Sequence, residues 1–369
     1  MSFAIELLLL QAAKMEASDL HISDRGPVVV RINGFLSKLE GALTEKIRSR
    51  SFVQNADWDS RETDSSSYYA VVEQQTLFPD REHIVFTLFE PILAEKQRVA
   101  LMDKGECDFA YELPSGHRFR INLYRSIEGL DAAIRIIPGE APTCEGLRLP
   151  KTIRMLSELK GGLVLITGIT GSGKSTTLAA IINEINRHRA VHILTLEDPV
   201  EYRFVSAKSL IHQREIGRDT ESFVSGLRAA LREDPDVVCI GELRDLESIA
   251  IAVTAAETGH LVFATLHTRS AAETVNRIVD VFPEGQQQQI RIQLAGSLQA
   301  VVSQQLLPNL MGGRTAAFEI MIVTSAIRNL IREGTTQQME SYIQTGSQYG
   351  MQTMEAAVAK LKRERIISP

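Results

Sequence analysis

The chain has 369 residues, of which 44% are apolar and 23% charged, a composition typical of a globular protein with two or three domains. Its formal net charge of −6, from 40 basic and 46 acidic residues, argues against a protein that holds nucleic acid through bulk positive charge. Cys107, Cys144 and Cys239 form no Cys-x-x-Cys pair, so neither a zinc site of that type nor a disulfide framework is expected. Because no apolar run is long enough to span a membrane, we expect a cytoplasmic protein without a transmembrane segment.

Residues 1–137 predict an N-terminal α+β domain. An amphipathic helix is followed by alternating strand patterns in SDLHIS and PVVVRINGFLSKL, and the second stretch contains a turn, Asn33-Gly34. A helical pattern then resumes in FTLFEPILAEKQRVALMDKG. Three further strand patterns follow it, in CDFAYELP, HRFRINLYRS and LDAAIRIIP.

Two stretches differ in composition from this domain. Residues 44–82 are polar, rich in Ser and Asp and weakly periodic, so we interpret them as a surface insertion with the character of a long loop. Residues 138–150 are rich in Pro and Gly, and we interpret them as the linker between two domains.

Residues 151–369 predict an α/β domain. Short apolar strand patterns alternate with helical patterns, in the order GLVLITG, STTLAAIINEINRHR, VHILTLEDP, TESFVSGLRAALRED, DVVCIGE, LESIAIAVTAAETG and HLVFATLHT. This alternation favours a parallel sheet with helices on both faces. From about Ala271 onward the pattern is mostly helical.

The segment GITGSGKST matches the phosphate-loop pattern G-x-x-x-x-G-K-[ST], and it lies between an apolar strand and a helix, as that motif requires. Its glycines let the backbone wrap around phosphates, and the helix N-terminus adds N–H donors. Lys174 is expected to reach the β- and γ-phosphates and Ser175 to bind Mg²⁺. The predicted nucleotide-binding residues are Gly168, Thr170, Gly171, Ser172, Gly173, Lys174, Ser175 and Thr176.

ATP hydrolysis also needs a carboxylate that handles water. Two acidic clusters end predicted strands: LEDPVE, which contains Glu197, Asp198 and Glu201, and VVCIGE, which ends in Glu242. A strand beside the phosphate loop normally delivers its terminal acid to Mg²⁺ or to the attacking water, so Glu242 is the predicted catalytic acid. The alternative is a solvated acid at a strand end.

His260 and His267 bracket the strand LVFAT. Because they are seven residues apart, they fall on opposite faces and at opposite ends of the strand, which makes them a poor metal pair. His267 lies at the carboxyl end, where α/β sheets place ligand contacts. A lone histidine is more often a residue with ordinary hydrogen bonds, and that alternative stays open for both.

Arginines are dense in RFRINLYR, with Arg118, Arg120 and Arg125, and in GLRAALRED, with Arg228 and Arg232 on one helical face. Surface salt bridging is the simpler interpretation. The functional one is stabilisation of charge on a transferring phosphoryl group, within a subunit or across a subunit boundary.

Taken in chain order, GITGSGKST, LEDPVE, LREDPDVVCIGELRD and ETGHLVFATLHT resemble the Walker A, Asp box, Walker B and His box of the secretion-ATPase superfamily, which powers type II secretion and type IV pili. Within that superfamily the chain is most similar to the PilT-type branch of pilus-retraction ATPases, through ASDLHIS, RFRIN, AIRNLIREG and GMQTMEAAV. The resemblance covers nearly the whole chain except residues 44–82.

The resemblance implies a PAS-like N-terminal domain, a RecA-like motor domain, a homo-hexameric ring and ATP with Mg²⁺ as cofactors. It also implies roles for individual residues. Glu242 corresponds to the catalytic glutamate, Glu197 and Glu201 to the Asp-box acids near Mg²⁺ and water, with Glu201 a further Mg²⁺ ligand, and His267 to the γ-phosphate contact. Arg118, Arg120 and Arg135 lie in strands similar to those that carry the family's N-domain arginines. The resemblance does not indicate which of the three reaches the nucleotide.

AIRNLIREG forms an amphipathic helical pattern in which Ile327, Leu330 and Ile331 share one face. Thr324 or Ser325 can cap its start, and Gly334 can close its end in a left-handed conformation. In PilT-type proteins this stretch is linked to retraction itself, so the resemblance implies an output element built on Ala326, Ile327, Arg328, Asn329 and Leu330. The alternative is a plain core helix, because packing alone explains the apolar face.

The chain departs from the family pattern in three places. Residues 44–82 form a longer insertion than the family shows, Ile169 replaces a usual Pro or Ala in the phosphate loop, and Ser325 replaces a common Pro before the AIRNL helix. Ile169 occupies an unconstrained position, so nucleotide binding should be little affected. Ser325 remains compatible with a helix start.

The resemblance implies retraction of type IV pili and twitching motility, at the inner membrane, with the cytoplasmic face of the membrane platform protein as partner and other pilus ATPases as further candidates. The alternatives in the same superfamily are an accessory, PilU-like retraction motor and a pilus-assembly or type II secretion ATPase. The latter branches carry an extra N-terminal domain and a four-cysteine insert that the sequence lacks. The net negative charge argues against a motor that translocates nucleic acid. The presence of Lys174, Ser175 and Glu242 argues against a nucleotide-binding scaffold that does not hydrolyse ATP.

Overall fold

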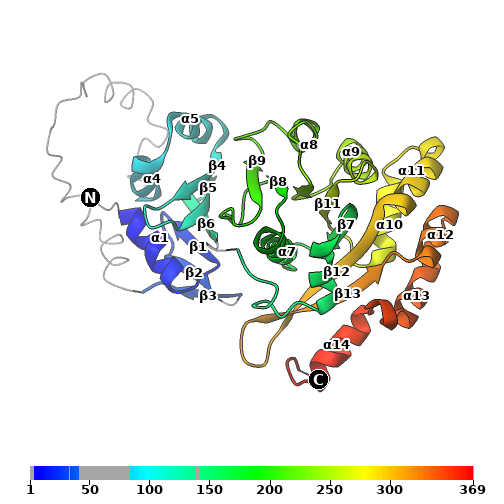
Figure 1. Cartoon of the computed structure of the whole chain (residues 1–369). Coiled ribbons are helices and arrows are strands. Elements are labelled where there is room, and N and C mark those ends of the chain that lie inside the picture. Colours follow the sequence, from blue (N-terminus) through cyan, green and yellow to red (C-terminus); the bar gives the residue numbers. More distant parts are fainter. Residues whose placement is uncertain (1–3, 33, 41–83, 138, 140, 369) are drawn as a thin grey trace. The chain divides into compact units, whose positions relative to one another are not determined.

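The computed structural model describes residues 4–32, 34–40, 84–137, 139 and 141–368. The chain divides into two compact units, Met1–Gly139 and Glu140–Pro369 (Figure 1). The insertion expected at 44–82 and Asn33 of the expected turn lie outside the described residues.

A six-stranded antiparallel sheet forms the centre of the described part of the N-terminal unit, in the order β3-β2-β1-β6-β5-β4. Its strands are Asp19–Ser23 (β1), Val29–Ile32 (β2), Phe35–Lys38 (β3), Glu106–Glu112 (β4), Arg118–Ser126 (β5) and Gly129–Ile137 (β6). Buried positions alternate along β1 and β6, as expected for strands with one face against a core.

Three helices bury their apolar sides with this sheet. They are Ala4–Lys14 (α1), Ile84–Phe89 (α4) and Glu95–Lys104 (α5), and a 3₁₀ turn, Glu90–Ile92 (η1), separates the last two. Leu8, Phe89 and Phe119 are fully buried in the shared core. Gly105, with φ of +79°, ends α5 in the left-handed conformation that the missing Cβ permits.

The C-terminal unit is built on a seven-stranded sheet in the order β13-β12-β7-β11-β10-β8-β9 (Figure 1). All neighbours are parallel except β13, which pairs antiparallel with β12. The strands are Gly162–Thr167 (β7), His192–Glu197 (β8), Leu210–Glu215 (β9), Val237–Ile240 (β10), Leu261–Leu266 (β11), Leu298–Pro308 (β12) and Arg314–Ile322 (β13). Every residue of β7, β10 and β11 is buried, which explains their continuous apolar sequences.

Helices cover both faces of this sheet. They are Lys151–Met155 (α6), Lys174–His188 (α7), Phe223–Ala230 (α8), Leu246–Glu257 (α9), Ala271–Asp280 (α10), Glu284–Ser297 (α11), Ser325–Glu333 (α12), Met339–Thr345 (α13) and Met354–Arg363 (α14), with 3₁₀ turns at Leu156–Glu158 (η2), Thr336–Gln338 (η3) and Ser347–Tyr349 (η4). Helices α6 and α7 pack on the face that includes Val164 and Phe263. Helices α8 to α13 contribute to the core on the other face, which includes Leu165 and Val262.

The predicted fold class, an α/β domain preceded by a smaller α+β domain, is confirmed. The expectation that the chain is mostly helical after Ala271 missed the long β12–β13 hairpin. Helix α11 ends at Ser297 and β12 begins at Leu298, so no turn residue separates the two patterns. Strand β9 was also missed, because this edge strand is mostly polar and only partly buried.

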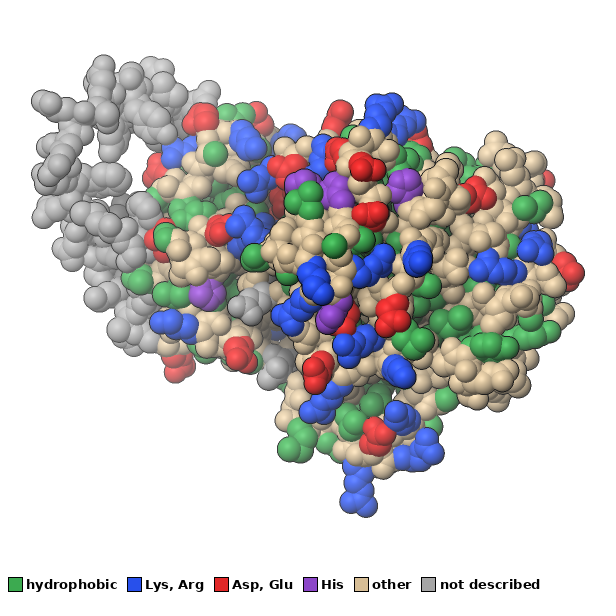
Figure 2. Space-filling model, in the orientation of Figure 1, with side chains coloured by type: hydrophobic (Ala, Val, Ile, Leu, Met, Phe, Trp, Pro, Cys, Tyr) green, Lys and Arg blue, Asp and Glu red, His purple; other side chains and the backbone are tan. Residues whose placement is uncertain are grey.

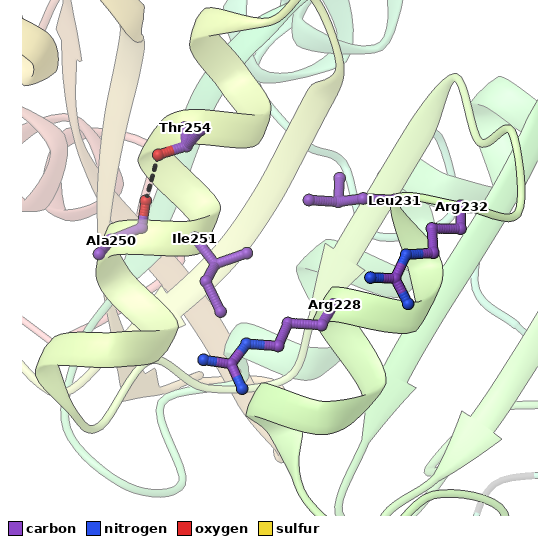
Figure 3. Close-up of a pocket in the computed structure, with 6 residues that line it drawn as sticks. All are labelled: Arg228, Leu231, Arg232, Ala250, Ile251 and Thr254. Atoms are coloured by element: carbon purple, nitrogen blue, oxygen red, sulfur yellow. Dashed lines mark hydrogen bonds between the residues drawn. The ribbon is translucent and has the colours of Figure 1, made fainter.

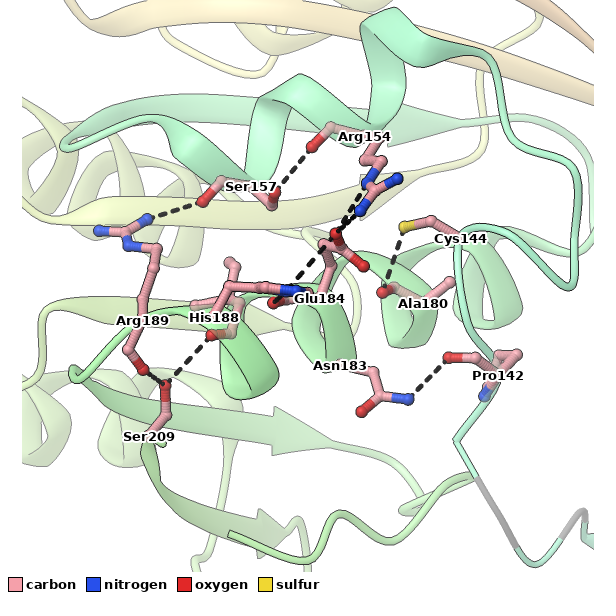
Figure 4. A network of polar contacts seen from close by, with 11 residues as sticks. Pro142, Cys144, Arg154, Ser157, Ala180, Asn183, Glu184, His188, Arg189 and Ser209 are labelled. Carbon is pink, nitrogen blue, oxygen red and sulfur yellow. Dashed lines mark hydrogen bonds and ion pairs between the residues drawn. The ribbon is translucent and has the colours of Figure 1, made fainter. Parts of the chain in front are cut away.

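Residues 141–144, within the range expected as a linker, are hydrogen-bonded to α7 (Figure 4). The Asn183 side chain donates hydrogen bonds to the carbonyls of Ala141 and Pro142, both at 3.0 Å. The thiol of Cys144 donates to the Ala180 carbonyl at 3.4 Å, and burial raises the pKa of this cysteine to about 11. The segment therefore follows the position of α7, the helix that starts at the predicted phosphate loop.

Helix α12 matches the expectation for AIRNLIREG. Ile327, Leu330 and Ile331 are buried, while Asn329 is exposed. The Thr324 hydroxyl accepts a hydrogen bond from the Ile327 amide, and so it caps the helix start. Gly334 closes the helix with φ of +74°.

The surface carries charges of both signs. On the face seen in Figure 2, basic and acidic side chains of the described residues are interspersed with polar and apolar ones. Among the described helices, none has both the length and the apolar character needed to cross a membrane.

Replacing Ile331 by alanine should lower the free energy of unfolding by about 2–5 kcal/mol, because the side chain is fully buried between α12 and the sheet core. Urea unfolding of the purified protein, followed by circular dichroism, measures this. Glu333→Ala, on the exposed side of the same helix, should change the stability by no more than about 0.5 kcal/mol. Equal effects of the two substitutions would contradict the observed packing of α12.

Candidate active site

The phosphate loop connects β7 to α7 and depends on its glycines. Gly168, Gly171 and Gly173 have φ values of +143°, +77° and +87°, which side-chain-bearing residues rarely adopt. A Cβ on Gly168 would also collide with the Gln304 carbonyl, and one on Gly173 would lie 2.8 Å from the Gln304 side-chain nitrogen. The loop can therefore lie against β12 only because these positions lack side chains.

Lys174 is the first residue of α7 and is only 8% exposed. Its ammonium donates hydrogen bonds to the carbonyls of Gly168 at 2.8 Å and Ile169 at 3.1 Å, so it lies within the curve of the loop. Burial lowers the pKa of Lys174, although the negative charges of Glu242 and Glu201 act in the opposite direction.

The other loop residues divide into exposed and buried groups. Thr170, Gly171 and Ser175 are exposed, which leaves the Ser175 hydroxyl accessible in the first turn of α7. The Thr176 hydroxyl lies 3.0 Å from the Tyr202 hydroxyl. Ser172 is buried, and its hydroxyl has no hydrogen-bond partner among the described residues.

Glu242 follows β10 by two residues and is held between two basic side chains. Arg244 Nη2 lies 2.8 Å from one carboxylate oxygen, and His267 Nε2 lies 3.0 Å from the other. Burial alone would raise the pKa of Glu242. The hydrogen bonds from Arg244 and His267, with the charge of Arg244, outweigh burial and lower the pKa below its ordinary value, so Glu242 is ionised at neutral pH.

His267 follows the last residue of β11 and connects Glu242 to the phosphate loop. Its Nδ1 lies 3.5 Å from both the Lys174 ammonium and the Thr170 hydroxyl. An ammonium can only donate, so the tautomer that fits both sides accepts at Nδ1 and donates its Nε2 proton to Glu242. The structure thus brings together Lys174, Glu242 and His267, three side chains that the sequence places far apart.

The two acids of the LEDPVE segment lie in different surroundings. Glu197 ends β8 and accepts hydrogen bonds from the Thr195 hydroxyl at 2.6 Å and the Gln213 amide at 3.1 Å. Burial raises the pKa of Glu197, while these hydrogen bonds act against the rise. Glu201 is exposed, and its negative charge acts on both Lys174 and Glu197. Of the two, Glu201 is therefore the more accessible for a metal ion or water.

The three arginines expected to act on nucleotide belong to the N-terminal unit, and each has an acidic neighbour there. Arg120 binds Asp108 at 2.6 Å, Arg135 lies 3.3 Å from Asp19, and Arg118 lies 3.9 Å from Glu112. Arg118 is buried, at 6% exposure. Contact between these arginines and nucleotide stays a prediction.

Arg228 and Arg232 lie together, as expected, but beside a separate groove. The groove lies between α8 and α9, measures about 480 Å³ and is lined by Arg228, Leu231, Arg232, Ala250, Ile251 and Thr254 (Figure 3). Arg228 forms an ion pair with Glu247. The lining contains neither a phosphate-loop residue nor Glu242, so the arrangement favours the salt-bridge interpretation for Arg228.

Sequence reasoning missed two residues of this cluster. Arg244 forms an ion pair with Glu242. The sequence GELRD could have predicted this pair, because an arginine two residues after Glu242 can reach its carboxylate. Gln304 contacts the phosphate loop from β12, and no local pattern marks it, since only the sheet order brings it there.

The carboxyl edge of the parallel sheet carries a phosphate loop with its lysine, a carboxylate suited to catalysis and a histidine. This combination defines a P-loop nucleotide-hydrolysing domain. The model of the family described as "Type II/IV secretion system protein" matches residues 147–365. The chain is 44% identical to the type IV pilus retraction ATPase PilT of Pseudomonas aeruginosa, over 98% of this chain and 94% of that protein.

Two further comparisons agree. The chain is 50% identical to a twitching motility protein of Neisseria gonorrhoeae, over 75% of each chain. Its structure is similar to the crystal structure of the pilus retraction motor PilT with bound ADP, with a TM-score of 0.80 and 41% identity, covering 100% of this chain and 95% of that one.

The chain therefore belongs to the type II/IV secretion system protein family, and within that family to the PilT-type ATPases. It is an ATP-hydrolysing enzyme with a nucleotide-binding, RecA-like motor domain. The functional roles of its individual site residues remain predictions.

Replacing Arg244 by glutamine should move the acidic limb of the ATPase pH profile to higher pH. Arg244 lowers the pKa of Glu242, so its loss raises that pKa, and Glu242 becomes protonated at a pH where the wild-type carboxylate is still ionised. Steady-state kcat/KM for ATP, measured from about pH 7 down to about pH 3.5, covers the range in which this carboxyl group titrates. Arg363→Gln, on α14, should leave the profile unchanged. An unshifted acidic limb in Arg244→Gln would show that Glu242 does not set it.

Proposed function

We propose that this protein is a hexameric ATPase that couples MgATP hydrolysis to the retraction of type IV pili and so supports twitching motility. The observation that carries the proposal is similarity over 98% of the chain to a named retraction ATPase, together with a complete set of nucleotide-site side chains. The similarity spans both units, so it includes more than the motor domain shared by many P-loop proteins.

The chemistry assigned to the site follows from its geometry. The phosphate loop and Lys174 bind the β- and γ-phosphates, as the burial of Lys174 inside the loop supports. The exposed Ser175 hydroxyl in the first turn of α7 fits the single protein oxygen that Mg²⁺ often takes beside nucleotide phosphates. Glu201, exposed and electrostatically coupled to Lys174, is a second candidate for the metal or its waters.

Glu242 is the proposed general base. Its low pKa keeps it ionised at neutral pH, so it can orient the attacking water and accept a proton from it. His267 lies between Glu242 and Lys174, and this position supports its proposed contact with the γ-phosphate. Arg118, Arg120 and Arg135 are the proposed suppliers of further positive charge, from the same subunit or a neighbouring one.

Helix α12 is the proposed output element. Ile327 and Leu330 anchor its apolar face, and Asn329 is exposed on the other side. Ala326, Ile327, Arg328, Asn329 and Leu330 form the segment that resembles the retraction motif. The proposed partner is the cytoplasmic face of the inner-membrane pilus platform, which would place the protein in the cytoplasm, peripherally at that membrane.

A strain whose only copy carries Glu242→Gln tests the proposal. The exchange keeps the shape of the side chain and removes the base, so we expect many surface pili and no twitching. Electron microscopy of pili and stab-agar motility assays measure both properties. Glu364→Gln, an exposed exchange near the end of α14, should behave as wild type.

Two other results would contradict retraction as the main role. Loss of surface pili in Glu242→Gln would mean that the enzyme assembles fibres. Unchanged pili and movement would indicate an accessory motor or a motor for another filament or transport system.

A further inference from the structure

Strand β12 begins beside helix α12 and passes the phosphate loop at its middle. There the Ser303 hydroxyl lies 2.9 Å from the hydroxyl of Thr167, the last residue of β7. The next residue, Gln304, reaches the loop itself. The amino end of β12 follows directly from α11 and adjoins α12.

The side-chain amide of Gln304 contacts the phosphate loop through its nitrogen and helix α7 through its oxygen. The amide nitrogen donates a hydrogen bond to the Ser172 carbonyl in the loop at 2.7 Å, and the amide oxygen accepts one from the Thr177 hydroxyl of α7 at 2.7 Å. Gln304 is 5% exposed, so neither contact is shared with bulk water. The loop and the start of α7 are thereby tied to one side chain of β12.

The amino end of β12 is tied to α12 in a similar way. Arg328 donates hydrogen bonds to the carbonyls of Ala295 and Gly296 at the end of α11, the latter at 2.9 Å, and lies 3.4 Å from the side-chain oxygen of Gln299. The Gln299 carbonyl also accepts a hydrogen bond from the Val323 amide at 2.9 Å. Arg328 therefore holds a junction between α11, β12 and α12. Arg328 was expected as part of the output element, but these contacts were not predicted from the sequence.

The strand between these two anchors is suited to carry a displacement. It is paired with β7 on one side and β13 on the other, and residues 300–304 are all buried. The five residue-to-residue steps from Gln299 to Gln304 span about 17 Å at roughly 3.3 Å per step. A register shift between Leu298 and Ala300 lies at the α12 end, where such irregularities re-aim side chains.

We propose that Gln304 is a positioning residue that fixes the phosphate loop to β12, and that β12 transmits changes at the loop to the junction held by Arg328. The inference deepens the proposed function, because only that function makes α12 the output element. A test of this transmission needs only the purified protein and nucleotide, because it compares the contacts with and without bound nucleotide. It therefore does not depend on pili.

The first test compares Gln304→Leu with Gln305→Leu. Leucine at position 304 removes both hydrogen bonds and leaves the Ser172 carbonyl and the Thr177 hydroxyl without this partner. We expect kcat/KM for ATP to fall at least tenfold. Gln305 is the next residue of the same strand and is exposed, so its exchange should stay within twofold of wild type. Should Gln304→Leu fail to fold, Gln304→Glu keeps the size and the acceptor for Thr177 and loses the donor to the loop.

Hydrogen exchange with mass spectrometry separates positioning from general support. In wild type, saturating MgADP should slow amide exchange in the phosphate loop, 168–175, and in the junction, 295–299. In Gln304→Leu or Gln304→Glu at saturating MgADP, protection of the loop should persist and protection of the junction should disappear.

Three outcomes would overturn the inference. If MgADP does not slow amide exchange at the junction of the wild-type protein, transmission from the loop to the junction is excluded. A Gln304 variant that keeps the response at both places would exclude Gln304 as the route. Loss of protection at the loop as well would show that Gln304 only supports the loop. Because these experiments use the purified enzyme, they can fail or succeed independently of the twitching assay.

Discussion

Parallel pairing of β7 with β11 and β12 is the constraint on which the site depends. In the observed register Thr167 lies opposite Leu266 on one side and Ser303 on the other. The next residues along these strands, Gly168, His267 and Gln304, are therefore brought to the same edge of the sheet. Strand β10, parallel to β11, delivers Glu242 to that edge. The phosphate-loop motif is local in sequence, but the complete site forms only because β7, β10, β11 and β12 are parallel and place their site residues at one edge of the sheet.

The charges at this edge are balanced by close contacts. Glu242 is held by Arg244 and His267, and His267 in turn approaches Lys174. Burial lowers the pKa of Lys174, whereas the basic neighbours of Glu242 lower the pKa of that carboxyl group. Negative phosphate oxygens would add charge next to the lysine and the histidine. They would therefore compete with Glu242 for His267, which gives nucleotide a physical means to change the surroundings of the proposed base.

The sequence was sufficient to predict the fold class, the phosphate loop, the buried face of α12 and its two caps, because each rests on local pattern or motif. It was not sufficient for Gln304, which lies more than a hundred residues from the loop in the chain and meets it only through the sheet order. It also missed β12, because a helix passes into a strand there without a turn residue. Arg328 was expected as part of the output element, but its hydrogen bonds to carbonyls at the end of α11 were not predicted. Such contacts depend on tertiary packing and leave no local periodicity.

The proposed role of Glu242 is to activate water for hydrolysis, and nucleotide binding should not depend on it. The most direct measurement is a comparison of purified wild type and Glu242→Gln for both MgATP affinity and hydrolysis rate. We expect a Kd within about threefold of wild type and a kcat at least about a hundredfold lower, because the base contributes to the reaction step and not to phosphate binding. Substantial remaining hydrolysis would contradict this role, as would an equal loss of binding and turnover.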